Sequence, residues 1–349
     1  MSTVTGSRQI IGFVFEDEGE FDQDPSEPTD DDLKDFGINE TLDTQDRDQN
    51  SERLYKPYER IPNEFLEGGF DGSWSADFIL THGLWLPAVY GGPEVDGDTY
   101  TFSLSKNNLP RTLQIVEQID YPDGEIEQTV YTGATTSDPD VDVSVGDPVD
   151  VSISGDYARE HTASTAEGED LFFGDPETGI EEQPDTDVRP LHYGNAELHL
   201  DLDNDGEAEF QSLIQDASVS LNGNVELEDE LGTRFAAAPS FLNFEADVSF
   251  TRLVNDDTKD DQKRLMYGGS ASQEPNETLV DSEIDGELHI DAGIPDELNE
   301  FEISLNGTFP DSFSRNNIGS PEDVIEEDVD RFVREVDFVV TTDQYDPSV

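Results

Sequence analysis

Between Phe65 and Thr132, apolar residues occupy every second position in four segments. These are WSADFIL at 74–80, DTYTFSL at 98–104, RTLQIVE at 111–117 and EIEQTVY at 125–131. A period of two is typical of a strand with one face in a core and the other in solvent. Asp-Gly pairs at 71–72, 96–97 and 123–124 favour the positive φ of tight hairpin turns. The stretch therefore predicts a meander of about four antiparallel strands.

The chain is strongly acidic. Its 349 residues include 84 Asp and Glu against 18 Lys and Arg, which gives a formal net charge of -66. Such self-repulsion opposes a compact state, and high charge is also typical of disorder. The 20 Phe, the 10 Tyr and the clean alternation argue against disorder. Because the Debye length is only ~3 Å in ~1 M salt, we interpret the composition as that of a folded protein from a haloarchaeal or similar salt-rich source.

Composition and motifs narrow the classes of function. The chain has no cysteine, so it has no disulfide and no thiolate ligand or nucleophile. Its acidity disfavours tight binding to nucleic acid phosphates. We expect no signal peptide at residues 1–8 and no membrane span, since no apolar run approaches the ~20 residues that cross a bilayer. No nucleophile elbow or phosphate-binding loop is present, and pairs of carboxylates carry no information among 84 acids. We therefore expect no enzyme.

We divide the chain into four parts. Residues 1–64 contain a strand at 10–15 and then an extended acidic arm, residues 65–160 form a β core, residues 161–194 form an acidic linker or loop, and residues 195–349 form a second β region. The whole stretch 154–194 lacks a strand period. Because a connection this long is unusual inside one compact fold, we favour an inserted or appended β-domain over a second sheet of one sandwich.

Turn and helix signals complete the secondary structure. Asn222-Gly223 predicts a hairpin between the runs before and after it, and Asn306-Gly307 is expected to close the run that precedes it. A short polar helix is expected at Asp256–Tyr267. The sequence Ser320-Pro-Glu-Asp323 is a helix start signal and predicts a helix up to Val336, followed by a strand. The expected fold class is mainly β: an antiparallel sandwich or barrel with one or two packed helices and long arms or loops.

One acidic loop is a candidate metal site. Asp201, Asp203 and Asp205, with Gly206, match the first positions of an EF-hand calcium loop. Ser212 stands where that loop has its bidentate Glu, and the flanking sequences have the pattern of strands. A calcium or magnesium site and a simple acidic hairpin both fit. The candidate ligands are Asp201, Asp203, Asp205, Glu207 and Glu209.

Several short sequences, in this order along the chain, resemble the major tail tube proteins of long-tailed viruses. They are QIIGFVF at 9–15 followed by Glu16, FDGSW at 70–74, FIL at 78–80, an apolar run around Trp85 ending in YGG at 90–92, NLPR at 108–111, and Glu127 through YTG at 131–133. With the acidic bias, the resemblance is to tail tube proteins of viruses that infect haloarchaea. It has some specificity over residues 8–160, whereas residues 195–342 share only a general pattern of strands and a helix.

This resemblance implies a structural role in the virion tail. Subunits of such proteins are β-sandwiches that form hexameric rings, and their inner strands join across subunits into a continuous barrel. The rings are assembled in the host cytoplasm and stack into a hollow tube that conducts the genome during ejection. The implied partners are copies of the same chain, other tail proteins and viral DNA that passes without sticking. The resemblance implies no catalytic site and no cofactor.

The resemblance also suggests where subunits meet. The segment Leu84-Trp-Leu-Pro-Ala-Val-Tyr90 is too apolar for a loop in solvent, so it packs internally or against a partner. We expect a neighbouring subunit, and not only the same chain, to bury the segment from Leu80 to Tyr90. The candidate interface residues are Trp74, Leu84, Trp85, Leu86 and Tyr90.

Two other functions stay open. One is a haloarchaeal cell-surface or receptor-binding β-sandwich, possibly stabilised by calcium. The other is a ring protein of the tail, such as a terminator or a baseplate component. Electron micrographs of the purified protein would separate these two functions from that of a tail tube protein. A surface module predicts discrete globules, a terminator or baseplate protein predicts single rings, and a tail tube protein predicts long tubes.

Overall fold

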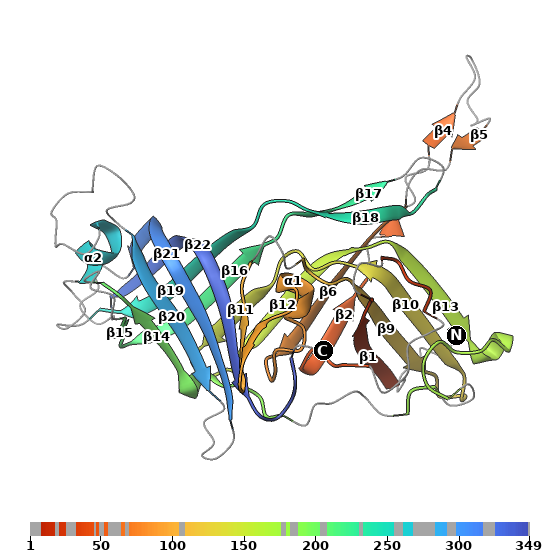
Figure 1. Ribbon diagram of the computed structural model, residues 1–349, viewed down its shortest axis with the longest axis horizontal. Helices are drawn as coiled ribbons and strands as arrows, with labels where there is room; N and C mark the ends of the chain where they lie inside the picture. The colour runs from red at the N-terminus through yellow and green to blue at the C-terminus, as the bar shows by residue number, and fades with distance from the viewer. Residues whose placement is uncertain are drawn as a thin grey trace.

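The computed structural model describes residues 8–17, 21–25, 33–44, 47–48, 52–54, 64–66, 70–104, 109–175, 179–181, 188–202, 208–229, 233–254, 261–267, 283–291, 298–316 and 325–347. Nearly all regular structure in these residues is antiparallel β-sheet, with two short α-helices, α1 (Pro87–Tyr90) and α2 (Asp261–Tyr267). The predicted mainly β fold class is therefore confirmed (Figure 1). The C-terminal half of the helix expected at Asp256–Tyr267 is confirmed as α2; residues 255–260 lie outside the described residues.

A four-stranded sheet contains β1 (Arg8–Phe15), β9 (Leu113–Asp120), β10 (Ile126–Ala134) and β13 (Arg159–Ser164), in that order. β9 and β10 form the hairpin predicted from Asp123-Gly124, and Gly124 has φ +91°. Since β13 pairs with β10 along its whole length, the expectation of a loop or linker throughout residues 154–194 is wrong.

A second, larger sheet runs through both halves of the chain. Its order is β15 (Glu209–Phe210), β14 (Ala196–Leu200), β20 (Ile284–Asp291), β21 (Asn299–Asn316), β22 (Glu326–Thr342), β19 (Glu245–Leu253), β16 (Ile214–Asn222), β11 (Asp140–Ser144), β12 (Asp150–Tyr157), β6 (Asp71–Ile79) and β2 (Ile38–Asp43). Because β11 pairs with β16, the region after residue 195 continues the sheet that the first half begins. The predicted domain boundaries stay a prediction, but this sheet crosses them.

Short strands and two ribbons extend from these sheets. β3 (Arg47–Asp48) pairs with β6, and the hairpin of β7 (Glu94–Asp96) and β8 (Thr99–Phe102) pairs with β22. β4 (Glu52–Leu54) pairs with β5 (Glu64–Leu66), and β17 (Val225–Asp229) pairs with β18 (Ala236–Phe241). Figure 1 shows the β17–β18 ribbon along the top of the molecule and the β4–β5 hairpin projecting at the upper right.

The core lies between the two sheets. Phe13 and Ile115 of the small sheet and Trp74, Phe78 and Ile153 of the large sheet belong to one buried cluster. The alternation that predicted strands in the sequence thus places one face of each strand in this cluster. The arrangement is an antiparallel sandwich, as expected.

The outer face of the small sheet is also covered. Phe173 and Ile180, from the predicted linker, pack with other apolar side chains against β1, β9 and β10. The buried amide of Gln118 donates to the Ile180 carbonyl (3.0 Å) and accepts from its N–H (2.8 Å). Gln128 binds the backbone of Phe173 in the same two ways. These two glutamines satisfy the backbone of a segment that has no strand partner, so part of the predicted linker is a cover for the sheet.

The predicted meander is only partly correct. Asp96-Gly97 and Asp123-Gly124 form turns, but Asp71-Gly72 lies inside β6. β6 pairs with β12 and β2, whereas β8 pairs with β22, so only β9 and β10 are neighbours. The local alternation identified the strands, but the distant pairing that forms the core determined their sheets.

Two predicted hairpin turns are absent. β17, which follows Asn222-Gly223, pairs with β18 instead of folding back on β16, and the Gly223 N–H donates to the Ser137 carbonyl. Asn306-Gly307 lies within β21, where Gly307 has φ +70° and donates its N–H to Asp285 Oδ1 at 2.7 Å. The strand continues because this carboxylate and the partner strand β22 hold the glycine in place.

The helix predicted to run from Ser320 to Val336 is wrong where the structure describes it. Residues 326–342 form β22, while residues 317–324 lie outside the described residues. Two of the inward positions of β22 carry Glu327 and Arg331, both fully buried. These charges interrupt the apolar period of two that would have predicted a strand. The remaining valines and Phe332 happen to fall at the spacing of one helical face, and this spacing led to the helix prediction.

Candidate assembly and channel surfaces

The residues predicted for a subunit interface lie in the core of the single chain. Trp74 comes from β6, and Leu84, Trp85, Leu86 and Tyr90 come from the turn before α1 and from α1 itself. None of the five is more than 8% exposed. The chain therefore buries these side chains without a neighbour.

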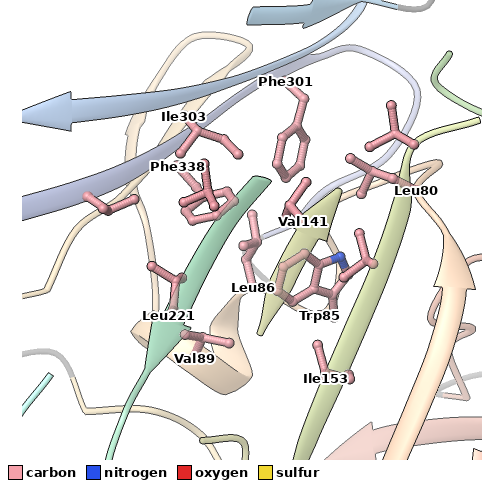
Figure 2. Close-up of a cluster of buried hydrophobic side chains, with 14 of the residues drawn as sticks. Leu80, Trp85, Leu86, Val89, Val141, Ile153, Leu221, Phe301, Ile303 and Phe338 are labelled. Atoms are coloured by element: carbon pink, nitrogen blue, oxygen red, sulfur yellow. The ribbon is translucent and has the colours of Figure 1, made fainter. Parts of the chain in front are cut away.

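The apolar segment around α1 joins the core of the large sheet. Figure 2 shows Trp85, Leu86 and Val89 pointing into the same cluster as Phe301 and Phe338. The Trp85 ring meets the Phe338 ring edge to face, with centroids 6.2 Å apart, and Tyr90 lies 5.5 Å from the same ring. The expected dependence on a neighbour for burial is not seen. A role for these residues at an interface stays a prediction, because one chain does not test contact with another.

Two of the five candidate metal ligands are described. Asp201 follows β14 and is buried, whereas Glu209 begins β15 and is exposed. Leu200 pairs with Glu209, so the acidic loop joins two adjacent strands. Asp203, Asp205 and Glu207 lie outside the described residues. Within the described part of the chain, no group of three or more acidic or histidine residues is placed to hold a metal. Calcium or magnesium binding by this loop stays a prediction.

A continuous polar surface covers the outward face of six neighbouring strands of the large sheet. We call it the Ser/Asp face. It consists of Ser73, Ser75 and Asp77 on β6, Asp150, Ser152, Ser154 and Asp156 on β12, Asp140, Asp142 and Ser144 on β11, Asp216, Ser218 and Ser220 on β16, Asp247, Ser249 and Thr251 on β19, and Asp328 and Asp330 on β22. No Lys or Arg is among these residues, but two apolar side chains share their register: Ile79 stands opposite Asp150, and the half-exposed Phe332 stands opposite Asp247.

The strand register places the residues of the Ser/Asp face side by side. Asp142 stands opposite Asp150 on one side and Ser218 on the other, and Ser218 stands opposite Ser249. Since residues that are directly opposite in an antiparallel pair point to the same face, the surface is continuous from β6 to β22. Along each strand, the residues of this face alternate with residues that enter the core.

Hydroxyl groups on this face donate to neighbouring carboxylates. Ser220 Oγ donates to Asp140 Oδ1 at 2.6 Å, and Thr251 Oγ1 donates to Asp328 Oδ1 at 3.0 Å. The hydroxyls of Ser218 and Ser249 lie 2.8 Å apart. The face is therefore a network of hydroxyls and carboxylates rather than a set of ion pairs.

Burial and neighbouring carboxylates raise the pKa of two acids on this face. Burial raises the pKa of Asp142, and the nearby charges of Asp140, Asp150 and Asp216 raise it further. Burial followed by neighbouring acids also raises the pKa of Asp247. A raised pKa means that the folded state disfavours the charged form. The face thus accumulates negative charge at some expense of stability.

The sequence contains a signal for this surface in four strand segments. The segments DVDVS at 140–144, DVSISGD at 150–156, DASVS at 216–220 and DVSFT at 247–251 all alternate Asp, Ser or Thr with apolar residues. Each segment alone indicates only a half-buried strand. The structure brings them together, because β11, β12, β16 and β19 are neighbours in one sheet.

The sheets also have edges that no described strand covers. β13 has a strand neighbour only at β10, and β15 only at β14. An uncovered edge presents backbone N–H and C=O groups that another chain can pair with. Such edges are available for pairing with strands of other chains.

The comparison with protein families identifies the class. The chain belongs to the phage tail tube protein family, which matches it over residues 6–340. It is therefore a non-enzymatic structural component of the virion tail that assembles with itself and with other tail proteins. A search of curated proteins found no significant match. Among the described helices, neither is long and apolar enough to cross a membrane.

Proposed function

We propose that the protein forms stacked hexameric rings whose Ser/Asp face lines the channel for viral DNA. The observation that carries this assignment is a face of six adjacent strands that consists mainly of hydroxyls and carboxylates, with Ile79 and Phe332 as apolar members and no Lys or Arg among the residues named above. Binding to DNA phosphates depends on cationic side chains, so a wall of this composition offers DNA no attachment point. DNA would slide along it during ejection.

We also propose a haloarchaeal or similar salt-accumulating host. The net charge of -66 supports this proposal, because repulsion between subunits of such charge is screened only in concentrated salt. In ~1 M salt the Debye length is ~3 Å, so the carboxylates of the channel would repel DNA only near contact. The wall would then act as a short-range non-adhesive surface.

Electron microscopy of the purified protein in molar salt tests the proposal. We expect long hollow tubes, and a three-dimensional reconstruction with the Ser/Asp face towards the channel. Single rings would indicate a terminator or baseplate protein, and discrete globules would indicate a receptor-binding or surface module. A tube with Lys or Arg around the channel, or with the Ser/Asp face turned away from it, would contradict the assignment of the wall.

The host proposal has a separate test in the salt dependence of assembly. We expect tubes in molar salt and dissociated subunits at ~0.1 M, where the Debye length reaches ~10 Å. Light scattering during dialysis follows this change. Equal assembly at both salt concentrations would argue against a salt-adapted virus while leaving the tube itself in place.

A further inference from the structure

Three exposed apolar side chains gather at one end of the β16–β19 pair. Val145, Phe210 and Leu213 are 54%, 56% and 41% exposed. They border a hollow of about 130 Å³ whose lining also includes the buried Leu198 and Leu288. Since about 10–15 Å³ of such volume is enough to hold one water, this hollow has room for one branched apolar side chain.

Backbone contacts hold this cluster, which we call the Leu213 hollow, against the sheet. The N–H of Val145 donates to the Gln215 carbonyl at 2.9 Å, and the N–H of Leu253 donates to the Leu213 carbonyl at 3.0 Å. Leu213 has φ +66°, in the left-handed region. A bulky residue reaches this region at a cost of about 1–2 kcal/mol. A strained leucine at the rim of an apolar hollow points to a functional contact.

Another exposed leucine lies at the opposite end of the same strand pair. Leu242 is 55% exposed, and its N–H donates to the carbonyl of Asn224, just beyond the end of β16. β16 has nine residues, so the two ends are roughly 30 Å apart at ~3.3 Å per residue. Leu242 and the Leu213 hollow therefore lie at opposite ends of the β16–β19 pair.

The two segments at these ends are poorer in acids than the rest of the chain. The segments FQSLIQ at 210–215 and TRFAAAPSFLNF at 233–244 contain no acidic residue, although 84 of the 349 residues are acidic. Two copies of a chain with a net charge of -66 repel each other where carboxylates meet. Because Asp216 lines the hollow and Glu209 and Glu245 flank the two segments, close approach of the two ends brings few carboxylates together rather than none.

We propose that the Leu213 hollow of one copy receives the turn around Leu242 of a second copy. The two surfaces differ and lie at opposite ends of a strand pair, so the contact is head to tail. A heterologous contact of this kind repeats from copy to copy, either around a closed ring or along an axis. The inference rests on the proposed tube and identifies a contact between neighbouring subunits of it.

Cysteine cross-linking tests this contact, because the natural chain has no cysteine. We would prepare Leu213→Cys, Leu242→Cys and the double variant, assemble each in molar salt, and treat it with a short bismaleimide. This reagent tolerates a wider separation than the ~4.4–6.8 Å between the Cα atoms of a disulfide. Both leucines are exposed, so their replacement leaves the core intact, and a melting curve for each variant checks the fold.

The expected products are specific to a head-to-tail contact. The double variant should give a ladder of covalent oligomers on a denaturing gel, and a mixture of the two single variants should give dimers. Neither single variant alone should cross-link. A mixture of Val95→Cys with Leu242→Cys is the matched control, since Val95 is also 55% exposed but lies on the β7–β8 hairpin, and it should give no dimer.

Other results would overturn the contact. Dimers from Leu213→Cys alone would indicate a symmetric contact instead of a head-to-tail one. Tubes of the double variant without a ladder would overturn the Leu213–Leu242 contact and leave the tube proposal standing. Protein that stays monomeric and uncross-linked in molar salt, as wild type and as variants, would overturn both.

Discussion

Glu16 fixes the N-terminal segment to the small sheet through a buried carboxylate. It accepts hydrogen bonds from Thr112 Oγ1 (2.6 Å), Gly133 N (2.9 Å), Gln23 N (3.1 Å) and Asp22 N (3.2 Å). Burial raises the pKa of Glu16 even though these donors lower it. The acid thus provides acceptors to three backbone N–H groups and one hydroxyl in a place that water does not reach.

We predict that Glu16→Gln lowers the free energy of unfolding by about 1–3 kcal/mol, because the amide nitrogen cannot accept and leaves buried donors unsatisfied. Urea denaturation of the unassembled protein in molar salt measures this change. The matched control is Glu125→Gln, an exposed acid in the β9–β10 turn, which should stay within about 0.5 kcal/mol of wild type. Equal stability of Glu16→Gln and wild type would refute the role of the carboxylate.

The left-handed backbone of Leu213 gives a second prediction for a single residue. Leu213→Gly removes the strain of a left-handed leucine, so we expect the free energy of unfolding of dilute, unassembled protein to stay constant or rise by up to about 1 kcal/mol. Tube formation should nevertheless decrease, because the rim of the Leu213 hollow is lost. Denaturation and light scattering measure the two effects. A destabilised monomer would instead indicate that Leu213 serves the fold.

At the scale of elements, helix α2 is fastened to β21 and β22 by a buried arginine. Arg331 donates from Nε to Thr308 Oγ1 (2.8 Å), from Nη2 to the Thr308 carbonyl (2.9 Å), and from Nη1 to the Leu265 carbonyl of the helix. Burial lowers its pKa to about 9. Arg252 adds a contact with Asp261 at the start of the helix, 3.4 Å long.

We predict that Arg331→Lys loosens α2, because one ammonium group cannot reach both Thr308 and Leu265. Amide hydrogen exchange within residues 261–267 should accelerate, and the free energy of unfolding should fall by about 1.5–3 kcal/mol, the range for hydrogen bonds to charged groups. Arg334→Lys is the matched control, since Arg334 on the same strand is 60% exposed. Unchanged exchange in α2 would show that its packing, and not Arg331, holds it.

Over the whole molecule, the Ser/Asp face makes stability depend on salt and pH. Asp142 stands directly opposite Asp150, and like charges in this position are destabilising. We predict that Asp142→Asn raises the free energy of unfolding at low salt by up to about 1 kcal/mol. The gain should shrink in molar salt, where repulsion is screened. Denaturation midpoints at the two salt concentrations measure it.

The same variant has a defined pH dependence. The folded state raises the pKa of Asp142 above its ordinary value of 3.8, so ionisation of this carboxyl destabilises the fold. Wild type should be less stable than Asp142→Asn above the raised pKa, and the difference should vanish as the pH falls through it and the carboxyl takes up a proton. A difference that persists or grows in acid would contradict ionisation of Asp142 as the cause.

Much of the local structure follows from the sequence alone. The alternation at 74–80, 111–117 and 125–131 predicted strands because the side-chain period of a strand is local. The turn at Asp123-Gly124 followed from the backbone freedom of glycine, and the acidic surface followed from composition. The order of short motifs before residue 160 was enough to indicate the tail tube family. None of these inferences required knowledge of which strands pair.

Only the tertiary structure decided how the strands assemble into surfaces. β11 pairs with β16 and β6 with β12 across long stretches of chain, and their shared core, not their sequence order, selects these partners. The core also makes β22 a strand. Arg252 donates to the buried Glu327, and the buried Arg331 donates to Thr308. These contacts satisfy the two charges that interrupt the apolar period of the strand in the sequence. Burial of Trp85 within its own chain, the Ser/Asp face and the Leu213 hollow all arise from such non-local contacts, which a period along the chain does not encode.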